Sequence, residues 1–161
     1  MNHISIDLIM EKCEKIFKQK LNNYDLSWKC INVSSIVDQI FMKIIRIQNI
    51  QKKGYQKVEE EKIMDTHMDI INYILIILIK KYTDYKKSIS HYDVIKIYSR
   101  EFYKIKLLYN KKNWIYSFSI EDIVNNIFLL KKKEKINSKE LKIFCLKMLN
   151  VTLTYLKKNI F

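Results

Sequence analysis

The chain contains no proline and a single glycine, Gly54, among its 161 residues. Tight hairpin turns need residues that accept positive φ angles, and glycine and proline are the most common residues of turns. Hydrophobic residues nevertheless make up 48% of the sequence, which is enough for a packed core. The composition therefore excludes every phosphate-binding loop built on several glycines, and it argues against a hairpin-rich β fold. It predicts an all-α protein.

The formal net charge of +13 is typical of proteins that bind nucleic acids. However, of the 30 basic residues only Arg46 and Arg100 are arginine, the residue whose planar group suits bidentate phosphate contacts. Ile, Lys, Asn, Tyr and Phe, which have AT-rich codons, make up more than half of the chain. We interpret the charge as mainly a result of codon usage in an AT-rich genome, and expect nucleic-acid binding to be weak and non-specific.

The three cysteines and three histidines follow no metal-binding spacing. Cys13 and Cys145 lie in apolar periodic stretches, which indicates buried thiols in a reducing compartment. His67 lies in an acidic segment, where it is read either as an ordinary helix residue or as a catalytic one.

The most hydrophobic segment, Ile70–Ile79, is too short to span a membrane, since a spanning helix needs about 20 apolar residues. The first 21 residues alternate charged and apolar side chains, which is unlike a signal peptide. We therefore expect a soluble cytoplasmic protein with no membrane segment, in which Ile70–Ile79 is a buried core helix.

Apolar residues spaced three and four apart predict six helices. The expected ranges are 6–21, 35–54, 59–82, 90–109, 120–135 and 139–158. Three Ser-x-x-Asp sequences, which begin at Ser35, Ser90 and Ser119, resemble the capping boxes that open helices.

An offset of about 84 to 86 residues aligns the first half of the chain with the second. It superposes Tyr24 on Tyr109, Trp28 on Trp114 and the Ser35 capping sequence on that of Ser119. The sequence thus predicts two copies of a three-helix unit, residues 1–84 and a degraded copy at 90–161. Such a duplication predicts a bundle of about six helices around an approximate two-fold, with the third and sixth helices packed together.

Three segments carry a resemblance to a known family: 17–29, 34–47 and 65–73. They resemble the nucleotide modification associated domain 1 family, whose pattern joins D-Y-G-x-x-W-R, S-S-L/I-T-D-x-I/L-x-x-K-x-x-R-I and a helix ending in D/G-x-x-N-Y-A. The resemblance covers roughly 13–82 well. This chain departs from the pattern at Asn23, Asp25 and Lys29, where the family has Asp, Gly and Arg.

That family is similar to the all-helical nucleotide pyrophosphohydrolases, which include MazG-like and dimeric dUTPase-like enzymes. Those enzymes bind magnesium through carboxylates on two helices and cleave between the α- and β-phosphates. The resemblance therefore implies a MazG-like bundle, a nucleotide or modified nucleotide as ligand and magnesium as cofactor. It is also compatible with a homo-oligomer.

The expected metal ligands are Asp38, Asp65 and Asp69, because oxygen ligands hold magnesium. Asp65, Asp69 and Asn72 are spaced so that they share one helix face. Asp38 is explained equally well as a helix cap. Asn72, a polar amide within an apolar run, is expected either to bind substrate or metal or to form buried hydrogen bonds.

The expected substrate contacts also include Gln39, Lys43 and Arg46, which share a face of the second helix, and Tyr24 and Trp28. In that reading Lys43 and Arg46 would bind phosphate oxygens. Alternatively, they form a solvated helix face or ion pairs with the acidic residues. The two aromatic residues would border a base or simply pack. In the second copy Ile127, Leu130 and Lys147 replace Lys43, Arg46 and Asp69, so no site is expected there.

The leading hypothesis is a nucleotide-binding protein resembling a magnesium-dependent phosphohydrolase. A second hypothesis is a non-catalytic helical adaptor that binds nucleic acid or a protein partner through lysines. A third is a relic whose fold has outlasted its chemistry.

Overall fold

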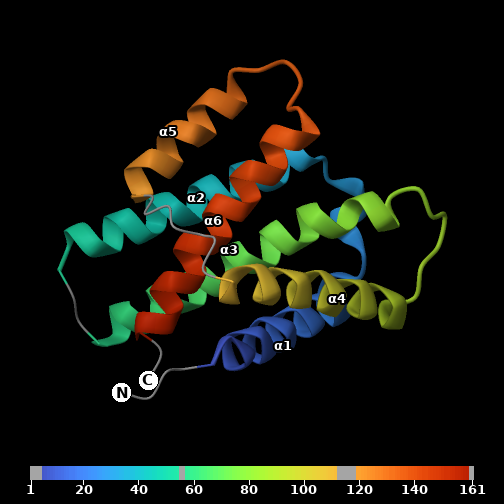
Figure 1. Ribbon diagram of the computed structural model, residues 1–161, viewed down its shortest axis with the longest axis horizontal. Helices are drawn as coiled ribbons and strands as arrows, with labels where there is room; N and C mark the ends of the chain where they lie inside the picture. The colour runs from blue at the N-terminus through green and yellow to red at the C-terminus, as the bar shows by residue number, and fades with distance from the viewer. Residues whose placement is uncertain (1–4, 55–56, 112–118, 160–161) are drawn as a thin grey trace.

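The computed structural model describes residues 5–54, 57–111 and 119–159. These residues form six α-helices and a short 3-10 helix, and they contain no strand (Figure 1). In chain order the elements are α1 (Ile6–Tyr24), η1 (Ser27–Cys30), α2 (Val33–Lys52), α3 (Lys57–Thr83), α4 (His91–Asn110), α5 (Ile120–Lys131) and α6 (Ser138–Asn159). The predicted all-helical bundle is confirmed.

The ends of the helices follow from capping residues. Ser90 and Ser119 accept hydrogen bonds from the backbone N–H groups of Asp93 and Asp122, as their capping sequences predict. α2 ends just before Gly54, whose φ of 86° is a conformation that glycine adopts easily.

The predicted capping box at Ser35 is wrong. α2 begins two residues earlier, and its N-cap is Asn32, whose side chain accepts the N–H of Ser35 at 2.8 Å. Asn is as good an N-cap as Ser, so the local sequence offered two competing starts. Asp38 consequently lies inside the helix and caps nothing.

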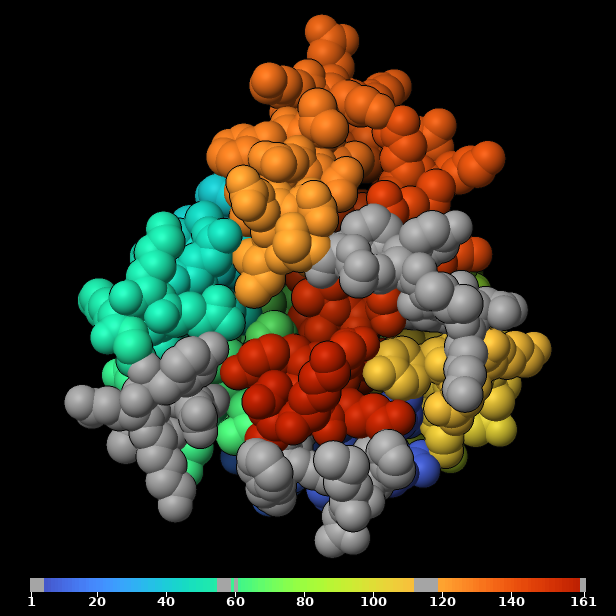
Figure 2. Space-filling view, turned by 60° about the vertical axis from the view of Figure 1, so that its left-hand side comes forward, coloured from blue at the N-terminus to red at the C-terminus, as the bar shows by residue number. Residues whose placement is uncertain are grey.

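The core is built around α3, which contacts α1, η1, α2, α4 and α6. Residues 70, 71, 74, 75 and 79 of its apolar segment are completely buried, which confirms Ile70–Ile79 as the central segment. α6 packs beside α3, as predicted, and Figure 2 shows the outer face of α6 between α2, α5 and α4.

Each helix of the first half also contacts its counterpart in the second half: α1 with α4, α2 with α5 and α3 with α6. An approximate two-fold between two three-helix units would produce these pairs. The duplication itself stays a prediction from the sequence. None of the described helices has the length and apolar composition needed to cross a lipid bilayer.

Candidate functional site

A pocket of about 330 Å³ opens between the C-terminal half of α1, η1 and the middle of α3. We call it the Trp28 pocket. Its lining residues are Phe17, Lys20, Leu21, Tyr24, Asp25, Ser27, Trp28, Ile31, Asp69, Asn72, Tyr73 and Ile76. The pocket thus combines aromatic and aliphatic walls with a small group of charged residues.

Asp69 is the centre of the charged group. Its Oδ1 accepts a hydrogen bond from Lys20 Nζ at 2.8 Å, and its Oδ2 accepts one from Lys43 Nζ at 2.7 Å. The three side chains come from α1, α2 and α3, so this cluster links all helices of the first half. With two ammonium groups and one carboxylate, the cluster has a net positive charge.

The protonation of Asp69 reflects these contacts. Partial burial would by itself raise the pKa of this carboxyl group, but hydrogen bonds and charge from Lys20 and Lys43 outweigh it. The pKa of Asp69 therefore lies below its ordinary value, and the carboxylate is ionised at neutral pH.

The aromatic part of the pocket consists of Tyr24, Trp28 and Tyr73. Tyr24 is 68% exposed, whereas Trp28 is buried in the wall. Within the described part of the chain, the buried indole Nε1 of Trp28 has no hydrogen-bond partner. A buried donor without a partner costs free energy. Lys20 Nζ lies 5.7 Å from the ring centre of Tyr73, within the range of a cation–π contact.

The buried side chain of Lys80, which is only 5% exposed, holds η1 and therefore this wall of the pocket in place. Its ammonium group donates to the carbonyl oxygens of Trp28 at 3.2 Å and Lys29 at 3.3 Å, and to the carboxylate of Asp84. These bonds satisfy carbonyl groups at the end of the 3-10 helix and hold Trp28 in place. A lysine at the end of the apolar run therefore positions the wall of the pocket.

Asn72 lies at the base of the pocket, but both ends of its amide are already bonded. Its Nδ2 donates to the carbonyl oxygen of Cys13 at 3.0 Å, and its Oδ1 accepts from the hydroxyl of Tyr98 at 2.7 Å. Of the two roles that the sequence left open, the structure supports the buried hydrogen-bonded amide.

The three predicted metal ligands do not gather in one place. Asp38 forms a 2.7 Å ion pair with Lys131 on α5, because it lies on the face of α2 that meets the second half. Asp65 is exposed one turn before Asp69. Throughout the described ranges, no group of three or more metal-ligating side chains is present.

The predicted substrate contacts on α2 are also separated. None of the three lines the Trp28 pocket: Lys43 bonds Asp69, which does line it, whereas Gln39 and Arg46 are exposed. The rotation of α2 about its axis explains the difference, because among these three side chains only that of Lys43 reaches α3. In the second half, Ile127 and Leu130 are buried core residues, in keeping with their apolar character.

Two charged residues of the pocket were not among the predicted site residues. Lys20 is one of several lysines at the end of the first helix, so its residue type did not distinguish it. The one indication of its role is its position next to Leu21, on the buried side of the helix. Asp25, considered only as a departure from the family pattern, adopts a φ of 51° and bonds His91 of α4 at 2.5 Å between Oδ1 and Nε2.

Comparison with known proteins identifies the segment that forms the pocket. Residues 20–80 match the sequence model of nucleotide modification associated domain 1. No curated protein and no solved structure matches the chain. The matched segment contains Lys20, Lys43 and Asp69 and nearly all of the pocket lining. The family resemblance seen in the sequence is thus confirmed over residues 20–80, the segment that matches the model of the nucleotide modification associated domain 1 family.

Proposed function

We propose that this protein binds a nucleotide or modified nucleotide in the Trp28 pocket. The observation that carries the proposal is that aromatic walls and Lys20, one lysine of the Lys20–Asp69–Lys43 cluster, line the same cavity. A nucleotide has a flat aromatic end and an anionic end, so it matches both parts. The name of the family is consistent with a role in nucleotide modification.

The two ends of the ligand would contact different residues. The ring of Tyr24 is exposed enough to stack on a base, and the buried ring of Trp28 would form part of the wall beside it. Lys20, which lines the pocket, would bind a phosphate oxygen. Asp69 would keep the ammonium group of Lys20 in position through their 2.8 Å hydrogen bond.

The size of the pocket limits the ligand. Small-molecule sites occupy roughly 300 to 1,000 Å³. The Trp28 pocket, at about 330 Å³, lies at the lower end of that range. A mononucleotide, or one nucleotide of a larger molecule, suits it best.

Magnesium does not fit the residues in their present arrangement. Asp69 is the one predicted metal ligand that lines the pocket, and each of its carboxylate oxygens accepts a hydrogen bond from a lysine. A divalent cation bound to Asp69 would be repelled by both ammonium groups, whereas a phosphate oxygen would be attracted to Lys20. The geometry therefore supports binding of the anion by lysine, and we derive no hydrolytic step from it.

The test is a thermal-shift measurement with a panel of nucleotides and modified nucleotides, each with and without magnesium. Binding of a ligand to the native state raises Tm, by an amount that depends on its concentration relative to Kd. We expect stabilisation by at least one nucleotide in the absence of magnesium. Stabilisation that strictly requires magnesium would contradict the lysine-based arrangement.

Matched variants locate the site. Lys20→Gln should abolish the shift, whereas Lys18→Gln, on the same helix but paired with Glu14 outside the pocket, should leave it unchanged. Tyr24→Ala should weaken binding, and Tyr103→Ala, which removes another exposed tyrosine, should not. If no member of the panel binds, or if both lysine variants behave alike, the proposal is wrong and the relic hypothesis is favoured.

A further inference from the structure

A second pocket lies between the C-terminal end of α3, the turn that follows it and the first half of α4. It has a volume of about 480 Å³, and we call it the Tyr85 pocket. Its lining residues are Tyr82, Tyr85, Lys86, Asp93, Lys96, Ile97 and Arg100. It shares no residue with the Trp28 pocket.

The charge of the Tyr85 pocket is positive. Lys86, Lys96 and Arg100 line it, against the single carboxylate of Asp93. That carboxylate accepts a 2.9 Å hydrogen bond from Ser90 as part of the helix cap, so it already has a structural role. Lys96 and Arg100 are one turn apart on α4, so the positive charge extends along the helix instead of meeting at one point.

The aromatic residues are interleaved with these cations. The guanidinium carbon of Arg100 lies 4.7 Å from the ring centre of Tyr82, and Lys86 Nζ lies 5.9 Å from that of Tyr85. Tyr85 is 74% exposed, so most of its ring is free to contact a ligand. Sites for single-stranded nucleic acid have these two features: cations that contact the phosphate backbone and aromatic rings on which the bases stack.

The turn that carries Tyr85 is held in place by four hydrogen bonds. The N–H of Lys86 donates to the carbonyl oxygen of Thr83 at 3.1 Å, and that of Asp84 to Lys80 at 2.9 Å. Lys29 Nζ donates to the carbonyl oxygen of Lys86 at 2.8 Å, and Lys80 Nζ donates to the carboxylate of Asp84. Little ordering of the backbone is therefore needed when a ligand binds, which favours affinity.

We propose that the Tyr85 pocket binds single-stranded nucleic acid, with backbone phosphates on Lys96 and Arg100 and an unpaired base on the ring of Tyr85. A duplex is disfavoured because its bases are stacked on each other and cannot cover an exposed tyrosine ring. A free nucleotide would use one cation, whereas the line of charge along α4 suits successive phosphates. This binding activity is separate from the one proposed for the Trp28 pocket.

The experiment measures fluorescence anisotropy of a short labelled poly-T oligonucleotide and of a duplex containing the same strand. Tyr85→Ala should weaken single-strand binding by about 5- to 140-fold, the range expected when one stacked base is lost. Tyr85→Phe should retain it, since the ring is kept. Arg100→Gln should reduce the slope of log K against log salt concentration by about 0.7 for the phosphate contact that is lost.

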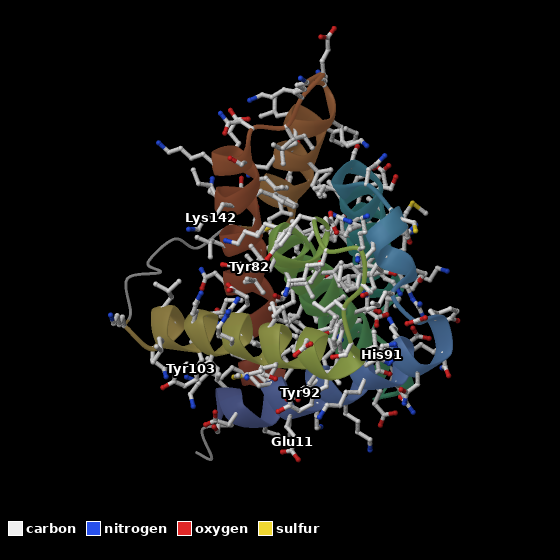
Figure 3. All side chains as sticks on the ribbon, turned by 90° about the vertical axis from the view of Figure 1, so that its right-hand side faces the viewer. Glu11, Tyr82, His91, Tyr92, Tyr103 and Lys142 are labelled. Atoms are coloured by element: carbon white, nitrogen blue, oxygen red, sulfur yellow. The ribbon has the colours of Figure 1, made fainter. Side chains whose placement is uncertain are left out.

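Tyr92→Ala is the matched control. Tyr92 has the same exposure of 74% as Tyr85 and lies on α4, the helix that carries Lys96 and Arg100, but it does not line the pocket. In the view of Figure 3, Tyr82 lies above α4 and Tyr92 below it. Tyr92→Ala should leave the affinity unchanged, and Tyr85→Ala should leave mononucleotide thermal shifts unchanged.

Equal losses for the Tyr85 and Tyr92 variants, or duplex binding as tight as that of the single strand, would overturn the proposal. So would an absence of measurable single-strand binding. Because Tyr85 and Arg100 lie outside the Trp28 pocket, failure of either proposal leaves the other standing.

Discussion

The hydroxyl group of Tyr98 donates a 2.7 Å hydrogen bond to the amide oxygen of Asn72 inside the core. The same amide donates from Nδ2 to the carbonyl oxygen of Cys13. One asparagine therefore joins α1, α3 and α4, and it connects the two halves of the chain. The ring of Tyr98 also stacks on Phe17 with ring centres 4.3 Å apart, which fixes the position of the hydroxyl.

Tyr98→Phe tests the energetic importance of that bond. The variant keeps the ring but leaves Asn72 Oδ1 buried without its partner, which costs about 1 to 3 kcal/mol. We expect the free energy of unfolding, measured by urea denaturation, to fall by that amount. Tyr109→Phe, in which a long hydroxyl contact of 3.4 Å to Thr154 is lost, should cost less. An unchanged stability of Tyr98→Phe would show that the Tyr98 hydroxyl does not stabilise the core.

His67 makes the fold sensitive to acid. It is 2% exposed, neither ring nitrogen has a hydrogen-bond partner within the described residues, and its ring stacks on Tyr155 at 4.2 Å. Burial lowers the pKa of His67 from 6.5 to about 3. Between these values the unfolded chain binds a proton that the native state does not, so stability falls as the pH decreases from 6.5 toward 3.

His67→Phe should remove this dependence. We expect the wild-type protein to lose up to about 1.4 kcal/mol per pH unit through this residue, and the variant to lose correspondingly less. Urea denaturation at several pH values between 7 and 4 measures the difference. His91→Phe is the control, because His91 is partly exposed and already paired with Asp25. Identical pH profiles for wild type and His67→Phe would contradict the prediction.

Asp69 contributes to stability over a lower pH range. Because the pKa of Asp69 is held below its ordinary value, its ion pairs stabilise the native state above that ordinary value. The contribution is lost as the pH falls through the lowered, native-state pKa. Asp69→Asn should reduce stability at pH 7 by about 1 to 3 kcal/mol, since two charge-assisted hydrogen bonds are weakened and two lysines lose their anion.

The control for Asp69 is Asp38→Asn. The ion pair of Asp38 with Lys131 is largely exposed, and exposed pairs contribute about 0 to 1 kcal/mol. Thermal unfolding of both variants at pH 7 compares them directly. Equal effects of the two substitutions would mean that the Lys20–Asp69–Lys43 cluster stabilises the fold no more than an exposed ion pair does.

The cysteines should differ in reactivity. Burial raises the pKa of the Cys145 thiol to about 12 and raises that of Cys13 as well, so neither forms a thiolate at neutral pH, whereas Cys30 is exposed. Titration with a thiol reagent should therefore modify one cysteine in the native protein and three after denaturation. Cys30→Ser should remove the native reaction. Rapid native labelling of that variant would contradict the described burial.

The sequence by itself determined the class of fold and most of its elements. The absence of proline, the apolar spacing and the capping residues Ser90 and Ser119 are local signals, and helices depend mainly on such signals. The segment Ile70–Ile79 could be placed in the core for the same reason, because its apolar side chains have no other way to leave water.

The tertiary structure alone decided which polar residues meet. Asp38, Asp65 and Asp69 were all suitable as metal ligands by residue type, yet Asp69 pairs with lysines 49 and 26 positions away in the chain. Those partners depend on how far each helix is rotated about its axis and where it crosses its neighbours. Periodicity identifies the buried side of a helix but not the residue that it faces, so the Trp28 pocket could be located only after the helices were packed.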